Sequence, residues 1–305
     1  AVDADGNEVD RFLGYESDGR FERWVAGLDG ATPLSKLEAG PAADATPGEA
    51  AAVALRLALA DKEDAAKAWL GVASGDSQAL HHARLLLVDE AQDDARWMLE
   101  HAPPGDWLYT LVDRYPELWP AAAPRVATLD PGTAAGCLDV YAGHQDADSA
   151  DTALAARVGA LALARSLLTG DPSHDRGRVV EIADLVVAVG DLGGGLALLT
   201  DFRTLYPAEF TWDFAMARHL LAAGRPAEAE ERARAALALS QGDQRLRATE
   251  RLARSLHALG RDADALATIE STLASTTRPD PALQVRTHRY IADLERLRGE
   301  LSAKK

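Results

Sequence analysis

One pattern of apolar and small residues occurs twice between residues 210 and 272. The first copy reads FAMARHLLAAGRPAEAEERARAALAL and the second reads ATERLARSLHALGRDADALATIESTL. In each copy an apolar stripe at helical spacing ends at a Gly-Arg pair, and a second helical segment follows. Glycine adopts the left-handed conformation that commonly ends a helix, so Gly224 and Gly260 predict corners between antiparallel helices. Their spacing of 260 − 224 = 36 residues predicts a repeated helical hairpin.

Two further glycines extend this register. Gly190 precedes Gly224 by 34 residues, and Gly299 follows Gly260 by 39. We expect Gly190 to be another corner and Gly299 to end a terminal helix over residues 281–302. Because a single helical hairpin cannot bury its own apolar face, such units must stack on their neighbours.

These features resemble the tetratricopeptide repeat family. The matching positions are the corner glycines, the small residue five positions later and a late Ala-Leu pair: Gly190, Gly224, Gly260, Gly299, Gly195, Ala229, Ala265 and Ala236-Leu237. The family's Trp near the repeat start is out of register here, and only Pro207 matches its terminal Pro. The clearest repeats cover residues 178–208, 210–241 and 246–276. The resemblance implies a right-handed α-solenoid whose first helices line a concave, protein-binding groove.

Residues 1–37 carry a different pattern. Valines flank Asp5-Gly6-Asn7, which is typical of a β-hairpin turn, and residues 21–28 form an amphipathic helical pattern. With Val9 and residues 12–14 in the last strand, this order resembles the C-terminal end of a thioredoxin-like domain. The resemblance implies a longer protein whose redox cysteine pair and cis-proline lie upstream. The lone Cys137 provides no such pair within this chain.

The sequence pattern in the middle of the chain predicts helices throughout. Residues 38–48 form a Pro/Gly linker, and Thr46 and Glu49 have the spacing of a capping box. We expect helices over residues 49–60, 63–72, 77–88, 93–101, 106–114, 120–129, 132–142 and 149–169. The predicted fold is therefore mostly α: a short β-hairpin plus helix over residues 1–37, the linker, and a helical-repeat domain over residues 49–305.

The charge of the chain narrows the choice of partner. It has 32 basic and 48 acidic residues, a formal net charge of −16. Such a field repels nucleic acid and anionic membrane surfaces. No apolar run approaches the length of a membrane span, so we expect no membrane insertion. A cytoplasmic location is favoured, while export after signal cleavage stays open.

A set of arginines is the candidate binding site. Arg247, Arg251 and Arg254 fall at i, i+4 and i+7 and share one helix face, and Arg218 and Arg289 occupy comparable places in neighbouring repeats. The functional hypothesis, weighed against the favoured interpretation of a solvated face, is a basic strip on the concave face that binds a carboxylate-bearing peptide through forked hydrogen bonds. The family's carboxylate clamp uses Lys and Asn, which these positions lack. The alternative is an ordinary solvated face with a Glu250–Arg254 pair.

The sequence thus predicts a protein–protein interaction scaffold, with a protein or peptide as partner. It would be the client-binding part of a longer thioredoxin-like oxidoreductase or redox chaperone. Two alternatives stay open: a self-assembly module that forms a homo-oligomer, and an enzyme built within the helices. We identify no catalytic residues, no metal ligands and no cofactor-binding motif.

Overall fold

The computed structural model describes residues 32–145, 149–278 and 284–303. These residues form 17 α-helices, one short 3-10 helix and no β-strand. The expected helical character is therefore confirmed. The mixed fold class with a β component is wrong for the described part of the chain, because every regular element there is a helix. The hairpin and helix expected before residue 32 lie outside the described residues.

The chain divides into two compact units, Ala1–Leu167 and Leu168–Lys305, called unit 1 and unit 2 below. The first described helix of unit 1 lies within the segment that we assigned to an N-terminal α/β unit. The helices of unit 1 are α2 (Leu34–Leu37), α3 (Pro47–Leu59), α4 (Glu63–Leu70), α5 (Gln78–Leu87), α6 (Gln92–His101), α7 (Trp107–Arg114), η1 (Pro116–Leu118), α8 (Trp119–Val126), α9 (Pro131–Gly143) and α10 (Ala150–Ser166).

Unit 1 has two main apolar cores. The first joins α2 to α5 around Leu34 and Leu57, and there the Trp69 indole Nε1 donates to the Leu37 carbonyl at 2.7 Å. The second core joins α5 to α9 around Trp107 and Leu108. Both cores are packed between short helices. The unpaired backbone N–H and C=O groups at the helix ends therefore lie close to buried surface and need hydrogen-bond partners there.

Arginine side chains close several of these helix ends. Arg114 at the end of α7 donates to the carbonyls of Leu85 and, at 2.7 Å, Val88, which end α5. Arg125 of α8 donates to the Ala102 carbonyl at 2.5 Å, which ends α6. A cation near the last carbonyls also complements the negative end of the helix dipole. Side chains from later helices therefore hold the corners of unit 1.

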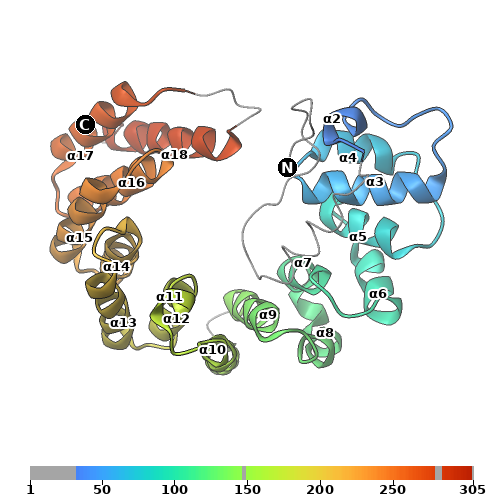
Figure 1. Cartoon of the computed structure of the whole chain (residues 1–305), viewed down its shortest axis with the longest axis horizontal. Coiled ribbons are helices and arrows are strands. Elements are labelled where there is room, and N and C mark those ends of the chain that lie inside the picture. The colour runs from blue at the N-terminus through green and yellow to red at the C-terminus, as the bar shows by residue number, and fades with distance from the viewer. Residues whose placement is uncertain (1–31, 146–148, 279–283, 304–305) are drawn as a thin grey trace. The chain divides into compact units, whose positions relative to one another are not determined.

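Unit 2 consists of helical hairpins followed by a final helix. Its helices are α11 (Pro172–Asp175), α12 (Val179–Ala188), α13 (Leu192–Leu205), α14 (Phe210–Ala222), α15 (Pro226–Leu239), α16 (Asp243–Ala258), α17 (Asp262–Ser275) and α18 (Val285–Ser302). Figure 1 shows that α12, α14, α16 and α18 follow the inner side of the arc of unit 2, while α13, α15 and α17 follow its outer side. We call these two faces the inner and the outer surface.

Glycines form the corners of the three hairpins, as predicted. Gly190, Gly224 and Gly260 have φ angles of 96°, 70° and 73°, which L-residues with a Cβ rarely adopt. The next amide reaches back five residues, as in the 2.9 Å bond from Arg225 N to the Leu220 carbonyl. This Schellman closure recurs at every hairpin. The expectation for Gly299 is wrong, because Gly299 lies inside α18 rather than at its end.

Small residues let the two helices of a hairpin approach closely. Ala229 and Ala265 are fully buried, five positions after their corner glycines. At the matching position in α13, a Cβ on Gly195 would lie only 2.6 Å from Cγ2 of Val187 in α12. Any side chain there would force α12 and α13 apart.

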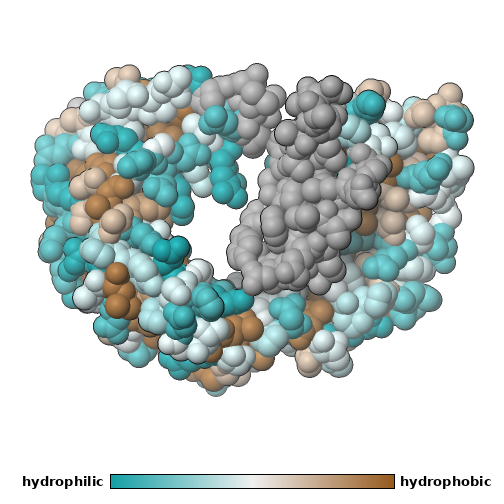
Figure 2. Space-filling model, in the orientation of Figure 1, coloured by the Kyte–Doolittle hydropathy of each residue, from teal (hydrophilic) through white to brown (hydrophobic). Residues whose placement is uncertain are grey.

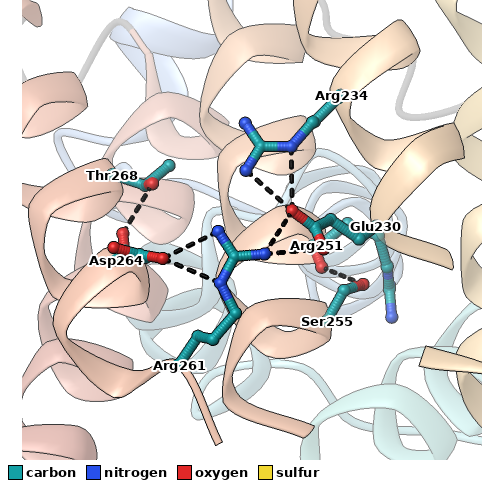
Figure 3. A network of polar contacts seen from close by, with 7 residues as sticks. All are labelled: Glu230, Arg234, Arg251, Ser255, Arg261, Asp264 and Thr268. Carbon is teal, nitrogen blue, oxygen red and sulfur yellow. Dashed lines mark hydrogen bonds and ion pairs between the residues drawn. The ribbon is translucent and has the colours of Figure 1, made fainter. Parts of the chain in front are cut away.

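Ion pairs join consecutive hairpins on the outer surface (Figure 3). Glu230 of α15 accepts from Arg234 at 2.7 Å and from Arg261 at 2.9 Å. Arg261, which follows the corner Gly260, also donates from Nε to Asp264 at 2.8 Å. The pair Arg225–Glu228 occupies the same place one repeat earlier. The guanidinium groups of this surface are therefore engaged with carboxylates.

Candidate peptide-binding surface

The five predicted arginines lie on the helices of the inner surface. Arg218 is on α14, Arg247, Arg251 and Arg254 are on α16, and Arg289 is on α18. Each helix is the first of its hairpin or, for α18, the single terminal helix. Whether these residues bind a ligand depends on what else surrounds each guanidinium group.

Two aromatic rings flank Arg247. Its guanidinium carbon lies 4.7 Å from the centre of the Phe214 ring of α14 and 5.7 Å from that of Tyr290 of α18. Both rings are half-buried. A guanidinium group stacks favourably on aromatic faces while the N–H groups at its edge stay free to donate. The arrangement holds Arg247 in place across three helices without using its hydrogen bonds.

Arg251 shares the Phe214 ring, with its guanidinium carbon 5.5 Å from the ring centre. Its Nε is buried and has no hydrogen-bond partner among the described residues. Burial lowers the pKa of Arg251, and the charges of Arg218, Arg254 and Arg247 lower that pKa further, while Glu250 raises it. Arg251 therefore lies in a partly dehydrated place among like charges, where an added anion would be stabilised.

The neighbouring arginines are already paired. Arg218 donates to Asp184 of α12, which also lies 2.8 Å from Nε2 of His219. Arg254 donates from Nε to Glu250 at 2.8 Å, the i,i+4 pair that the alternative interpretation expects. Within the described residues, neither Arg247 nor Arg251 forms an ion pair. The strip is thus uneven: Arg218 and Arg254 are neutralised, whereas Arg247, Arg251 and Arg289 form no ion pair among the described residues.

Arg289 lies at the border of this group. Its side chain is exposed, and its guanidinium carbon is 5.5 Å from the ring of Tyr290 in the same helix. Because Tyr290 also contacts Arg247, the ring connects the two arginines. Arg289 can approach a ligand held at Arg247, but nothing fixes it as tightly.

Sequence reasoning missed Phe214 and Tyr290, the rings that organise the site. One signal was present for Phe214. Residues 36 apart occupy equivalent positions in consecutive repeats, so Phe214 on α14 is the equivalent of Glu250, which lies beside Arg251 on α16. Nothing comparable marks Tyr290, because α18 has no corner glycine to set its register. We call Phe214, Arg247, Arg251 and Tyr290 the arginine–aromatic centre.

Other chemistry is limited in the part of the chain that the structure describes. No cluster of three or more His, Cys, Asp or Glu side chains could hold a metal ion there. Burial raises the pKa of the Cys137 thiol to about 12, so it is not a nucleophile at neutral pH. None of the helices described combines the length and the apolar character that crossing a membrane requires.

The visible face of unit 2 is largely hydrophilic (Figure 2). Apolar residues appear on it as separate patches rather than as one continuous area. Recognition on such a face relies on polar groups and single aromatic contacts more than on a broad apolar area.

Comparisons with known proteins leave the family open. No protein-family model matches the chain, and a search of curated proteins finds no significant match.

Proposed function

We propose that the inner surface of unit 2 binds a peptide segment of a partner protein, and that an anionic group of this segment sits at the arginine–aromatic centre. One observation carries the proposal: Arg251 is partly dehydrated, stacked on Phe214 and without a carboxylate partner. Leaving a buried donor unpaired is unfavourable, and structural arginines normally find acceptors. A site that is incomplete in the free protein is suited to a ligand.

The geometry suits recognition rather than catalysis. Phe214 and Tyr290 flank the guanidinium group of Arg247, and Phe214 also contacts that of Arg251, so less side-chain freedom is lost when an anion binds. The outward N–H groups can then donate paired hydrogen bonds to an oxygen-bearing group. The rings also offer apolar contact to the residue beside it.

The repeat architecture supports the same function. Corner glycines 34 and 36 residues apart and stacked hairpins agree with the likeness to tetratricopeptide repeats. In that family the first helix of each hairpin lines the groove, and the arginine–aromatic centre lies on the first helices here. The link to a thioredoxin-like redox protein stays a prediction.

Self-assembly is the second candidate, and α18 disfavours it at that end of the repeats. Ile291, Leu294 and Leu297 of α18 are buried against the preceding hairpin. The opposite side of the helix exposes the charged residue Arg296. A polar outer face is what a terminal capping helix needs in order to stop further stacking.

A peptide-display selection on the full chain tests the proposal. Selected peptides should bind an Arg247→Glu, Arg251→Glu variant at least about tenfold more weakly than the wild type. The control is Arg245→Glu, a charge reversal at one exposed position on the same helix. It should change affinity by less than about twofold. Peptides that bind all three proteins equally would place recognition elsewhere and refute the proposal.

A further inference from the structure

The number of uncompensated charges at the arginine–aromatic centre indicates what kind of anion it takes. Arg247 and Arg251 are four residues apart on α16, so their side chains leave the same face of the helix. Both guanidinium groups lie near the one ring of Phe214, at 4.7 and 5.5 Å. The two guanidinium groups therefore contact the same ring and belong to one small part of the inner surface.

Within the described residues Arg247 and Arg251 form no direct ion pair, and the charge of Glu250 acts on Arg251 without contacting its guanidinium group. Asp184 pairs with Arg218, and Glu250 pairs with Arg254. Across the described residues no carboxylate comes within ion-pair distance of Arg247 or Arg251. A single carboxylate would neutralise only one of these two groups and leave the repulsion between the other and its neighbours in place.

We infer that the centre binds a dianionic group, namely the phosphoryl group of a phosphorylated side chain in the partner peptide, rather than a single carboxylate. This inference rests on the proposed function. A phosphorylated side chain carries a charge of about −1.5 to −2 at pH 7 and three acceptor oxygens. Planar guanidinium groups match such oxygens in pairs, so two of them can hold one phosphoryl group from two sides.

The charge of the whole chain limits the ligand to one such group. With a formal net charge of −16, the protein repels extended polyanions at long range. A local pair of dehydrated arginines acts at contact distance, where that field matters less. The combination favours a single phosphoryl group on a peptide that is otherwise neutral or basic, and disfavours nucleic acid.

Three peptide pools with the same random flanks test this inference on the full chain. The fixed central residue is phosphoserine in the first pool, glutamate in the second and serine in the third. We expect the phosphoserine pool to bind about tenfold more tightly than the glutamate pool. In an Arg247→Gln, Arg251→Gln variant this preference should fall to about twofold or less, while an Arg245→Gln control should keep it.

A second variant keeps the test valid if the Arg247→Gln, Arg251→Gln variant does not fold. Arg247→Lys with Arg251→Lys keeps both charges but loses the paired N–H groups, and we expect it to lose most of the preference for phosphoserine. Circular dichroism melts establish that each variant is folded.

Three results would overturn the inference, and they separate it from the proposed function. Equal binding of the glutamate and phosphoserine pools, both sensitive to Arg247 and Arg251, would mean that the centre takes a carboxylate; the proposed function would then stand. A preference for phosphoserine that Arg245→Gln removes as strongly would indicate diffuse charge attraction. Binding that ignores Arg247 and Arg251 altogether would defeat both proposals.

Discussion

The two units close their helix ends in different ways and carry very different charge. Residues 1–167 hold 28 acidic and 13 basic residues, a net of −15, whereas residues 168–305 hold 20 and 19, a net of −1. Nearly all of the acidity of the chain belongs to unit 1. Unit 2 by itself scarcely repels an anion, so arginines left without a carboxylate there can serve recognition.

The two units also differ in how the chain turns between consecutive helices. Unit 2 repeats one backbone solution, a glycine with positive φ, at residues 190, 224 and 260. Unit 1 closes its α3–α4 corner locally, with Asp61 at a φ of 61°, but holds other helix ends with side chains from distant parts of the sequence, as when Arg114 reaches the end of α5. A local corner is visible in a sequence as a recurring residue, and a long-range corner is not. Substitutions at each kind of corner test this difference between the two units.

The largest effect is expected at Arg114. An Arg114→Met variant keeps much of the apolar stem but leaves the carbonyls at the end of α5 without their donor. Hydrogen bonds from a charged donor contribute about 1.5–3 kcal/mol, so we expect a loss of that order. Urea unfolding followed by circular dichroism measures it. An Arg96→Met control, at an exposed i,i+3 pair, should cost less than about 0.5 kcal/mol. Equal losses in the two variants would show that Arg114 does not hold the corner.

Next come the glycines of unit 2, where two substitutions should act in opposite directions. Gly260→Ala places a Cβ on a residue with φ of 73° and should destabilise the protein by about 1–2 kcal/mol. Gly299→Ala lies inside α18 with open space around the new Cβ, and it should stabilise by about 0.5–1 kcal/mol. Thermal melts of the two variants check both signs. If Gly299→Ala destabilised as much as Gly260→Ala, the assignment of corner and helix interior would be wrong.

A smaller effect concerns the acid stability of unit 1. The two ring nitrogens of His81 lie 2.7 Å from Asp94 and 2.8 Å from Asp76, and the ring stacks on Trp97. The hydrogen bond to His81 lowers the pKa of Asp76, against a smaller opposing effect of burial. A carboxyl group with a lowered folded pKa stabilises the fold above its unfolded pKa, near 3.9, and ceases to do so as the pH falls through the folded value.

The stability advantage of the wild type over Asp76→Asn should therefore shrink as the pH falls from about 4 downward. Urea unfolding at a series of pH values gives the two curves. Asp93→Asn, at a carboxylate that is 99% exposed, is the matched control and should run parallel to the wild type. A gap for Asp76→Asn that stays the same down to about pH 2 would contradict the role of His81.

The smallest change is expected at Cys137, which is buried in unit 1. With its pKa raised to about 12 by burial, the thiol should not react with a thiol-specific reagent at pH 8 in the folded protein. On denaturation one thiol per chain should react. Rapid labelling of the folded protein would show that the core around α9 opens readily.

Local sequence signals predicted much of the fold. The capping box of Thr46 and Glu49 forms as expected, with Thr46 N donating to Glu49 at 2.9 Å. The corner glycines and the helices of unit 1 also lie close to the predicted places. Each of these depends on neighbouring residues, whose chemistry determines the local backbone.

What the sequence did not reveal depends on contacts between distant segments. Gly299 was misplaced because a helix interior tolerates a glycine at a cost of about 1 kcal/mol, and its own sequence looks the same as that of a corner. Phe214 and Tyr290 lie on α14 and α18, on either side of α16, and only stacking of the three helices brings them to Arg247. The five arginines could be assigned to one surface, but which of them are neutralised could not.

Side-chain NMR of arginine Nε–H groups tests the central claim most directly. Arg247 and Arg251 represent the inner surface, and Arg225 and Arg261, both paired with carboxylates, represent the outer surface. On addition of a display-selected peptide to the full chain, we predict that the signals of Arg247 and Arg251 shift while those of Arg225 and Arg261 stay in place. Shifts confined to Arg225 and Arg261, with Arg247 and Arg251 unchanged, would contradict the assignment of the inner surface as the binding site.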